Sequence, residues 1–451
     1  MSRLFKTVNY EETLDSQVRL GDCLPQDHLA RFVVDIVSQL NLAPLYARYS
    51  SRGGAPYAPE VMLALLFYGY ATGVFASRKI ERATRETATF RYLAGNYSPD
   101  HDTIASFRKQ FLPQLKDLFV QILLLASEMG LVEMGNVHID GTKVRADASK
   151  SKAVSYKRLQ ELELFLQTEV EELFALAEQA DSTTPEGMDL PQELARREER
   201  LKRLAEARAV LEARAAQRHL LEQAEHEAKM AERQAHEERT GKKPRGKPPT
   251  PPTPGPRDKD QYNFTDPDSR IMKNSRDDGF SQQYNAQVAV EQDSRLVVGF
   301  SLSNHANDQQ EAAPTLDSIP EALGPVQAAA LDTGYFSQAN IDVLEDRQIE
   351  PYIATGRHPH NQGFRAFFAE SGAPPPPDAS PRQKMAHKLR TAVGKAIYRR
   401  RKCTVEPVIG IIKETMGFRQ FSLRGQQPVA GEWCLVCLAY NLRRLHVLQG
   451  A

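Results

Sequence analysis

The chain has 451 residues, of which 41% are hydrophobic and 26% are charged, and its acidic and basic residues balance to a formal net charge of +0. This length exceeds that of one ordinary core and predicts two or three domains, while the composition is typical of a protein that folds in water. No stretch approaches the roughly 20 uncharged apolar residues of a membrane span, and the first residues lack the apolar run of a signal peptide, so we expect a protein of the cytoplasm.

The cysteines and the loop motifs argue against further classes. Four cysteines are too few for a disulfide framework in a chain of this size. Cys434 and Cys437 lack a second pair or nearby histidines for zinc, so we expect them in the core. The chain has no GxxxxGKS or GxxxxGKT loop, which argues against nucleotide hydrolysis.

Residues 29–130 have the apolar spacing of amphipathic helices separated by turn signals, and they predict an all-helical module. In its last segment Asp102 is the expected N-cap, and Arg108 and Lys109 are left for solvent or a phosphate backbone. Two interpretations stay open for this segment: a DNA-binding helix-turn-helix, or an ordinary amphipathic helix with solvated charges. Its apolar stripe comprises Ile104, Phe107 and Phe111.

Residues 156–240 form an insertion that is rich in Ala, Glu, Leu, Arg and Gln and has almost no β-branched residues. Leucines recur with a spacing of three and four, stop at residues 181–192, and then resume. This pattern predicts an antiparallel helical hairpin or a coiled coil with 181–192 as its tip. Residues 241–257 are proline-rich and basic, and they predict a linker that cannot continue a helix. The leucines of the two runs are Leu159, Leu162, Leu166, Leu173, Leu176, Leu194, Leu201, Leu204 and Leu211.

From residue 266 onward, short β-type runs alternate with short helical runs. The two β-type runs on either side of Asp293 and Ser294 predict a hairpin. Together with a strand that begins at Val137, the order of strands and helices predicts a mixed sheet with helices packed on it, interrupted by the insertion after its first strand. The expected fold class is therefore α+β or α/β with several domains. The long segment 356–385 predicts a mobile loop.

Two predicted strands run into an aspartate followed by Gly or Thr. "VHIDGTK" places Asp140 after an apolar run, and "AALDTGY" does the same with Asp332. The carboxyl end of a strand faces the crevice where α/β sheets bind ligands, so the two carboxylates converge if their strands are neighbours. The alternative for either residue alone is a turn or a cap, because Asp before Gly or Thr is a common turn signal.

A third acid, Glu406, lies in a strongly basic run. Residues 388–424 contain ten Lys or Arg residues and two acids. Thr404 is the expected cap of a helix that holds Glu406 and Pro407 in its first turn. Glu406 and Lys413 would then share one face of that helix. A solvated surface accounts for the bases but not for the carboxylate among them.

Two Asp and one Glu gathered at the end of a sheet repel one another unless a cation neutralises them, and hard oxygen ligands suit Mg²⁺ or Mn²⁺. Two ions about 4 Å apart can activate a water or a 3′-hydroxyl and stabilise the leaving oxygen in phosphodiester transfer. The neighbouring bases would then hold the phosphates. Composition and spacing alone leave open a helicase-like or a purely structural acid cluster.

Five segments, in this order, resemble the DDE transposases of bacterial insertion sequences, most closely the group named for insertion sequence eleven-eighty-two. The segments are "HIDGTKVRADAS", "TDPDSRIMKNSRDDGFSQQYNAQVAV", "NHANDQQ", "LDTGYFS" and "YRRRKCTVEPVIGIIKETMGFRQFSLRG". The resemblance implies a ribonuclease-H-like catalytic core with Asp140, Asp332 and Glu406 as its catalytic, metal-binding acids. Its cofactors would be two Mg²⁺ or Mn²⁺ ions per active site.

The resemblance also implies a signature of Tyr, Arg, Glu and Lys around the third acid. Glu406 and Lys413 match the spacing of the family, whereas Tyr398 and Arg401 lie one residue further from Glu406, with Lys402 in the arginine position. The residues expected to contact DNA are Lys413, Lys402, Arg401, Tyr398, Arg399, Arg400, Arg108 and Lys109.

These expectations combine into a domain plan and a function. We expect strand cleavage and strand transfer at the terminal inverted repeats of a mobile element and into target DNA, by a homodimer assembled on double-stranded DNA at the nucleoid. The alternative is a catalytically inert DNA-binding or assembly protein derived from a transposase. The expected domains are an N-terminal helical DNA-binding domain (1–130), the first part of the catalytic core (131–155), the helical hairpin insertion (156–240), the linker (241–257) and the rest of the core with C-terminal helices (258–451).

Overall fold

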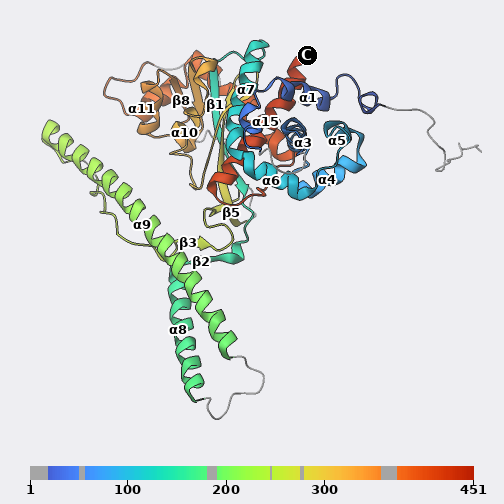
Figure 1. Cartoon of the computed structure of the whole chain (residues 1–451). Helices are drawn as coiled ribbons and strands as arrows, with labels where there is room; N and C mark the ends of the chain where they lie inside the picture. Colours follow the sequence, from blue (N-terminus) through green and yellow to red (C-terminus); the bar gives the residue numbers. More distant parts are fainter. Residues whose placement is uncertain are drawn as a thin grey trace, which may run out of the picture. The chain divides into compact units, whose positions relative to one another are not determined.

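The computed structural model describes residues 19–49, 56–179, 190–243, 246–274, 279–356 and 373–450. The chain divides into two compact units, one made of residues 1–145 and 284–451 and the other of residues 146–283 (Figure 1). The expected hairpin tip at 181–192 falls largely outside the described residues. Of the expected loop at 356–385, residues 357–372 lie outside them, and the prediction is wrong for its last residues, which begin a helix at Pro381. Within the described ranges, every helix is too short or too polar to span a lipid bilayer.

The first unit begins with a bundle of helices around α3, which is apolar on all sides and buried along nearly its whole length. Such a helix needs partners on several faces, and α3 packs against α1 and the C-terminal helix α15. The prediction of a helical N-terminal region is confirmed. The helices are α1 (Leu29–Gln39), α2 (Ala43–Tyr46), α3 (Pro59–Ala71), α4 (Ser77–Glu86), α5 (Ala88–Leu93), α6 (His101–Phe111), α7 (Leu115–Glu128) and α15 (Gln426–Gln449).

Helix α15 joins this bundle to the sheet of the same unit. It packs on α3 and α7 and also on strand β6 (Val297–Ser303). Its middle turns are buried on every side and include Trp433, Cys434 and Cys437. Both cysteines therefore lie in the core, as their lack of metal-binding neighbours in the sequence predicts.

The N-terminus of α6 lies earlier than the sequence suggests. Asp100 caps the helix, and its carboxylate accepts a hydrogen bond from the backbone N–H of Thr103 at 2.7 Å. The expected cap, Asp102, lies in the first turn instead, because Asp100 already provides an extended residue with an acceptor side chain. The apolar stripe of Ile104, Phe107 and Phe111 is buried as predicted.

Arg108 lies within this apolar stripe. Residues 104, 107, 108 and 111 repeat at the spacing that brings side chains onto one helical face, so Arg108 turns inward with its neighbours. Its guanidinium is buried and donates hydrogen bonds to the Tyr70 hydroxyl at 3.0 Å and the Phe75 carbonyl at 3.1 Å. The prediction that Arg108 faces solvent or a DNA phosphate is therefore wrong, whereas Lys109 is exposed.

The sheet of the first unit has the strand order β6-β5-β1-β7-β8. Strands β1, β7 and β8 are parallel, while β5 and β6 form the antiparallel hairpin predicted around Asp293 and Ser294. Helices α10 (Ala312–Leu316) and α11 (Gln338–Asp346) follow in the predicted order, so the mixed sheet with flanking helices is confirmed. The other strands are β1 (Asn136–Arg145), β5 (Phe280–Glu291), β7 (Ala328–Leu331) and β8 (Glu350–Ile353).

The helix that carries Glu406 starts earlier than predicted. Helix α14 spans Ala392–Gly410, and the Thr391 side chain caps it by accepting a hydrogen bond from the Gly394 N–H at 3.1 Å. The first turns, residues 392–398, contain Val, Gly, Ile and Tyr as well as Ala and Lys, so the cap at Thr391, more than residue propensity, accounts for the early start of the helix. Thr404 is therefore a buried residue inside the helix, and the prediction that it caps the helix is wrong. A shorter helix, α13 (Pro381–Lys388), precedes α14.

Pro407 consequently lies in a helix interior, where it removes one backbone hydrogen-bond donor. Residues Ile411–Thr415 then form a π-helical turn, which is wider than an α-helical turn. The prediction that Glu406 and Lys413 share one helical face assumes a regular α-helix, so it does not apply across this π-helical turn.

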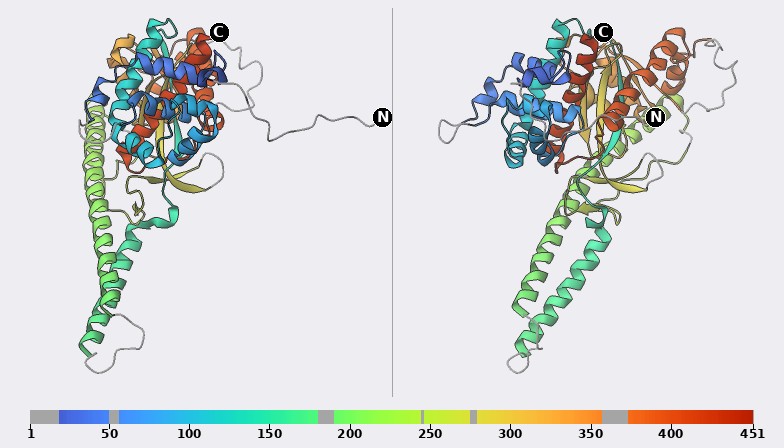
Figure 2. Two further views of the ribbon diagram at one scale, coloured as in Figure 1. Left: turned by 45° about the vertical axis from the view of Figure 1, so that its right-hand side comes forward. Right: turned by 90° about the vertical axis from the view of Figure 1, so that its right-hand side faces the viewer.

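The second unit contains the insertion as two packed helices, α8 (Tyr156–Gln179) and α9 (Leu190–Thr240) (Figure 2). Glu169 pairs with Arg197 at 3.1 Å and Glu163 pairs with Arg208 at 2.9 Å, so residue numbers rise in opposite directions and the helices are antiparallel. The leucine spacing predicts this arrangement, and the coiled-coil alternative stays a prediction. The buried core between the helices comprises Val154, Leu159, Leu166, Leu204, Ala207 and Leu211.

The proline-rich linker runs back along α9. Side chains of α9 interact with backbone carbonyls of the linker. As residue numbers increase along the linker, those of its α9 partners decrease, so the linker is antiparallel to α9. Strands β2 (Ala153–Ser155) and β3 (Gln261–Asn263) pair beside the two ends of the insertion, and β4 (Arg270–Lys273) pairs with the start of β5. The linker contacts are Gly246 with Arg233 (3.0 Å), Pro249 with His226 (3.2 Å) and Gly255 with Arg218 (3.3 Å).

Candidate active site

Strands β1 and β7 bring the two strand-associated aspartates together. The two strands are parallel, and His138 pairs with Ala330. The pairing ends at this residue pair. Extended by two residues, the register would align Asp140 with Asp332, and the negative charge of Asp332 acts on Asp140. Asp332 follows directly after β7 and caps a short 3-10 turn, with its Oδ1 atom accepting a hydrogen bond from the Gly334 N–H at 2.7 Å.

Asp140 itself does not end a strand, contrary to the sequence-based prediction. Strand β1 continues to Arg145, whose backbone bonds to the carbonyl of Arg419 at 3.2 Å and to the N–H of Phe421 at 2.9 Å. These bonds keep the chain extended after the pairing with β7 has stopped. Asp140 therefore lies two residues beyond the last residue that is paired with β7.

Arg401 forms ion pairs with both Asp140 of strand β1 and Glu406 of helix α14. Its Nη2 atom lies 2.6 Å from Asp140 Oδ2, and its Nη1 atom lies 3.3 Å from Glu406 Oε1. The Arg401 side chain is 10% exposed, whereas that of Glu406 is 48% exposed. Burial alone would lower the pKa of Arg401, but the charge of Asp140 and its neighbours raises it. One buried guanidinium thus neutralises two of the three predicted acids.

This position differs from the one predicted for Arg401 within a DNA-facing basic run. Arg401 turns inward to the acids, and Tyr398 is half-buried against β7 and β8, where burial raises its pKa. Arg399, Arg400 and Lys402 are exposed. Arg400 pairs with Asp293 at 2.6 Å, and Lys413 donates a hydrogen bond to the Lys143 carbonyl of β1 at 3.1 Å. Within this basic run, Arg401 is therefore buried against the acids, whereas Arg399, Arg400 and Lys402 are exposed.

Burial shifts the ionisation of Asp140. Loss of water around this carboxyl raises its pKa from 3.8 to about 6; Arg401 and the Gly141 N–H oppose the shift, and the negative charges of Asp332 and Asp308 add to it. The folded protein therefore holds a proton on Asp140 over a pH range in which an exposed aspartate is ionised.

We expect Asp140→Asn to gain stability relative to the wild type as the pH rises from about 4 to about 6. The neutral carboxyl favours folding below its unfolded pKa, and that contribution is lost as the pH rises through the raised folded pKa. The difference in free energy of unfolding should change by up to about 3 kcal/mol. Denaturant unfolding across this range measures the difference. Asp346→Asn, at an exposed site, is the control, and a pH-independent difference for Asp140→Asn would contradict the expectation.

The donor chemistry of the three acids fits a hard divalent cation. Carboxylate oxygens are the ligands that Mg²⁺ and Mn²⁺ prefer, and here a positive charge already lies between two of them. Across the described part of the chain, no group of three or more His, Cys, Asp or Glu side chains is arranged to hold a metal ion. Arg401 lies between Asp140 and Glu406, so its guanidinium brings these two acids together, and Asp332 has no ion pair with it.

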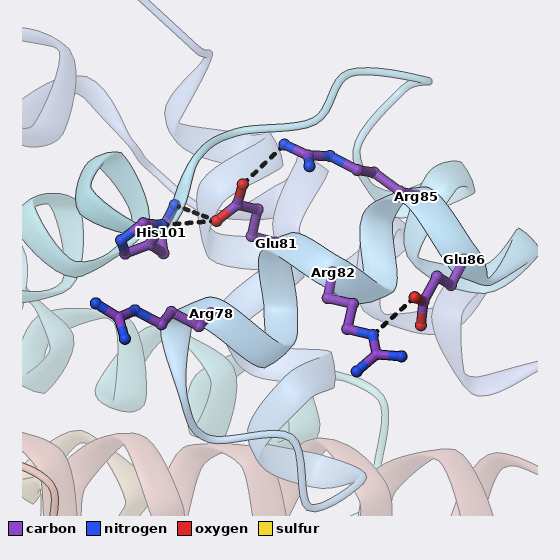
Figure 3. A pocket seen from close by; sticks show the side chains of 6 residues that line it. All are labelled: Arg78, Glu81, Arg82, Arg85, Glu86 and His101. Atoms are coloured by element: carbon purple, nitrogen blue, oxygen red, sulfur yellow. Dashed lines mark hydrogen bonds and ion pairs between the residues drawn. The ribbon is translucent and has the colours of Figure 1, made fainter.

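A second polar feature, which the sequence-based reasoning missed, lies on helices α4 and α6. A pocket of about 400 Å³ is lined by side chains of alternating charge (Figure 3). Arg85 pairs with Glu81 at 2.7 Å, Arg82 pairs with Glu86 at 2.7 Å, and Arg78 has no ion-pair partner among the described residues. The lining residues are Arg78, Glu81, Arg82, Arg85, Glu86 and His101.

The signal for this surface is present in the sequence. In "SRKIERATRE", the arginines at 78, 82 and 85 are spaced by four and three residues, so they share one helical face. Ile80 and Thr84 lie on the opposite, buried face. His101 closes the pocket from α6, with its Nδ1 atom 2.7 Å from Glu81 Oε2.

Two protein families match the chain, one over an N-terminal range and one over a C-terminal range. Residues 18–110 match a transposase domain (DUF772), and residues 250–442 match a transposase DDE domain. Together the two domains indicate a DDE-type transposase. No curated protein and no solved structure gave a match. The second match indicates an enzyme of the polynucleotidyl transferase type, and the mixed sheet with flanking helices fits its ribonuclease-H-like α+β core.

The residues of the candidate site lie partly inside and partly outside the two matched ranges. Asp332, Arg401 and Glu406 lie within the DDE match, whereas Asp140 lies between the two matches. The α4 pocket lies within the first match. Asp140 thus enters the site on the evidence of the β1–β7 register and its ion pair with Arg401.

Proposed function

We propose that this transposase cuts and joins DNA strands at the ends of an insertion sequence, of the group named for insertion sequence eleven-eighty-two. Asp140, Asp332 and Glu406 are its metal-binding acids, and its cofactors are two Mg²⁺ or Mn²⁺ ions. The observation that carries the proposal is the ion-pair system in which the buried Arg401 joins Asp140 of β1 to Glu406 of α14. The Arg401 guanidinium is a cation bound between two of these acids, which supports the proposal that the acids bind positively charged ions.

The residues of the site have separate tasks in this scheme. When bound, two such ions activate a water or a 3′-hydroxyl and stabilise the leaving oxygen. Arg401 neutralises Asp140 and Glu406 in the metal-free protein, so it must release at least one of them before both acids can serve as ligands. Below about pH 6, Asp140 must also lose its proton, because only the carboxylate is a strong ligand.

The bases around the acids would then hold the DNA backbone. Arg399 and Lys402 are exposed on the same helix as Glu406, where they can reach phosphates. Lys413 binds the β1 carbonyl of Lys143, which fixes the helix end against the strand that carries Asp140. We assign Lys413 this positioning role together with the DNA contact predicted from the sequence.

The alternative function is an inert DNA-binding or assembly protein. A cleavage assay on supercoiled or linear DNA that carries the element ends, with and without Mg²⁺, separates the two. The transposase proposal predicts metal-dependent cuts at the element ends. A gel shift without any cleavage, across several concentrations of Mg²⁺ and Mn²⁺, would favour the inert protein.

We further propose that the arginine face of α4 contacts phosphates of the element ends. Arg78, Arg82 and Arg85 lie on one exposed face. Arg82 is held by an ion pair with Glu86, and Arg85 by an ion pair with Glu81 and a hydrogen bond to the Ser98 hydroxyl at 3.0 Å. Such pairs contribute at most about 1 kcal/mol each, so DNA phosphates can replace the carboxylates. This surface takes the place of Arg108 in the expected N-terminal DNA-binding domain.

Replacing all three arginines with Ala should weaken binding to every DNA sequence. Phosphate contacts carry no sequence information, and each lost contact should reduce the slope of log affinity against log salt concentration by about 0.9. Fluorescence anisotropy at several salt concentrations, with element-end and unrelated DNA, measures both effects. Arg347→Ala, at an ion pair with Asp317 elsewhere in the first unit, is the control. An unchanged slope in the triple variant would exclude this surface.

The insertion is proposed to assemble a homodimer on DNA. Its two ends are adjacent, because the Tyr156 N–H donates to the Asp260 carbonyl at 2.8 Å and the Lys157 N–H lies 3.4 Å from the Asp258 carbonyl. Joining Ser155 to Asp258 with a short flexible linker therefore keeps the β2–β3 pair, and we expect a folded protein that still binds DNA. Native mass measurement with element-end DNA should show loss of the paired complex. A paired complex at wild-type abundance would make the insertion a passive spacer.

A further inference from the structure

Asp308, which belongs to the segment "NHANDQQ", is anchored by hydrogen bonds, and the proposed mechanism gives it no role. Its Oδ1 atom accepts hydrogen bonds from Asn285 Nδ2 at 2.7 Å and Gln287 Nε2 at 2.9 Å. Both amides are on β5 and both residues are almost completely buried. The Oε1 atom of Gln287 in turn accepts a hydrogen bond from the buried Tyr335 hydroxyl. A carboxylate on a loop is thus anchored to the centre of the sheet.

The two glycines that follow the candidate aspartates show how close Asp308 lies to both. A Cβ atom on Gly141 would lie 2.8 Å from Asp308 Oδ1. A Cβ atom on Gly334 would lie 3.3 Å from Asp308 Oδ2 and 3.0 Å from Asp332 Oδ1. One oxygen of Asp308 therefore packs against the residue after Asp140, and the other lies near Gly334, whose N–H donates to Asp332. Any side chain at position 141 or 334 would compete with this packing.

The hydrogen bonds of Asp308 are unevenly distributed between its oxygens. The two amide donors both bind Oδ1, so they orient the side chain and leave Oδ2 on the side of Gly334. A surface aspartate without such anchors would turn its charge into water.

We propose that Asp308 is a fourth acid of the active site, a positioning residue whose anchored charge strengthens divalent-cation binding by Asp140 and Asp332. The inference rests on the proposed function, because it concerns the same cation site. Asn285 and Gln287 are the buried supports that hold the charge in place. Gly141 is required because a Cβ atom there would collide with Gln287 Nε2 and would lie 2.8 Å from Asp308 Oδ1, and Gly334 leaves room for Asp308 beside the turn that Asp332 caps.

The test is the affinity of the full-length protein for Mn²⁺, measured by calorimetry for the wild type, Asp308→Asn and Asp332→Asn. Asp308→Asn keeps an oxygen acceptor for the two amides and removes the charge, so we expect Mn²⁺ to bind at least about tenfold more weakly. Asp308→Glu, which restores the charge, should bind more tightly than Asp308→Asn. Asp317→Asn removes a charge from an exposed ion pair in the same unit and should change nothing.

The outcomes separate this inference from the proposed function. If Asp332→Asn loses Mn²⁺ binding while Asp308→Asn stays within twofold of the wild type, the role of Asp308 is overturned and the cation site stands. If the wild type binds no Mn²⁺, the proposed function and this inference both fail. Should Asp308→Asn not fold, Asp308→Ser, which keeps a hydroxyl acceptor, is measured in its place against the same limits.

Discussion

Replacing Asp140, Asp332 or Glu406 singly with the matching amide should abolish DNA strand cleavage while leaving the affinity for element-end DNA close to that of the wild type. Each amide keeps the shape of the side chain and removes the charge that a divalent cation needs. The cation supplies several kcal/mol of transition-state stabilisation, so we expect the cleavage rate to fall at least about a thousandfold. Cleavage kinetics and gel shifts on the same DNA substrate measure the two effects together.

Glu414→Gln is the matched control for this series. Glu414 lies in the same basic run as Glu406, but it is 59% exposed and pairs with Arg419 away from the acids. This variant should cleave at the wild-type rate. Near-normal cleavage by Asp332→Asn would refute the assignment of the triad. Equal loss of DNA binding and cleavage in all three amide variants would point to misfolding instead of chemistry.

Replacing Glu432 with Ala should lower the free energy of unfolding by about 3–5 kcal/mol. This carboxylate is fully buried on α15 and accepts hydrogen bonds from the Tyr70 hydroxyl at 2.9 Å, the Ser422 hydroxyl at 2.5 Å and the backbone N–H groups of Ser422 (2.9 Å) and Leu423 (3.0 Å). Its removal leaves several buried donors without an acceptor. Arg108, which donates to the same Tyr70 hydroxyl, would lose a neighbouring negative charge.

Chemical denaturation measures the loss. Glu414→Ala is again the control, since an exposed ion pair contributes at most about 1 kcal/mol. A destabilisation by Glu432→Ala no larger than that of the control would show that the network around α15 does not hold the helical bundle to the sheet.

The sequence predicts those parts of the fold that depend on regular periodicity. The strands before Asp332 and around Asp293 alternate or run apolar over several residues, and the turn residues between them are explicit. The leucines of the insertion lie three and four residues apart, which suffices to predict two helices. These features depend on neighbours in the chain, so one sequence reveals them.

The errors concern residues whose environment is set by distant segments. Arg108 resembles a surface base until Tyr70 and Phe75 are placed beside it. Arg401 resembles a member of a DNA-facing basic run until β1 supplies Asp140 as its partner. Strand β1 passes Asp140 because residues 419–421 bond to its far end, nearly 300 residues later in the chain. No local pattern contains such information.

Asp308 shows the same limit for the candidate site. The segment "NHANDQQ" is part of the family resemblance, but an aspartate in a polar segment carries no local sign of a role. Its proximity to the site follows from two alternate residues on β5 and from the absence of side chains at Gly141 and Gly334. A search for polar residues on one face of a predicted central strand would have found Asn285 and Gln287, and these would have pointed to a buried acceptor.

Anomalous X-ray scattering from crystals of the protein soaked with Mn²⁺ tests the central claim most directly. We predict an anomalous peak in contact with the carboxylates of Asp140 and Asp332, with Glu406 turned toward the same site and the Arg401 guanidinium withdrawn from at least one of its two acids. A Mn²⁺ peak elsewhere, with the Asp140–Arg401–Glu406 ion pairs intact at saturating Mn²⁺, would contradict the assignment of these three acids as the metal site.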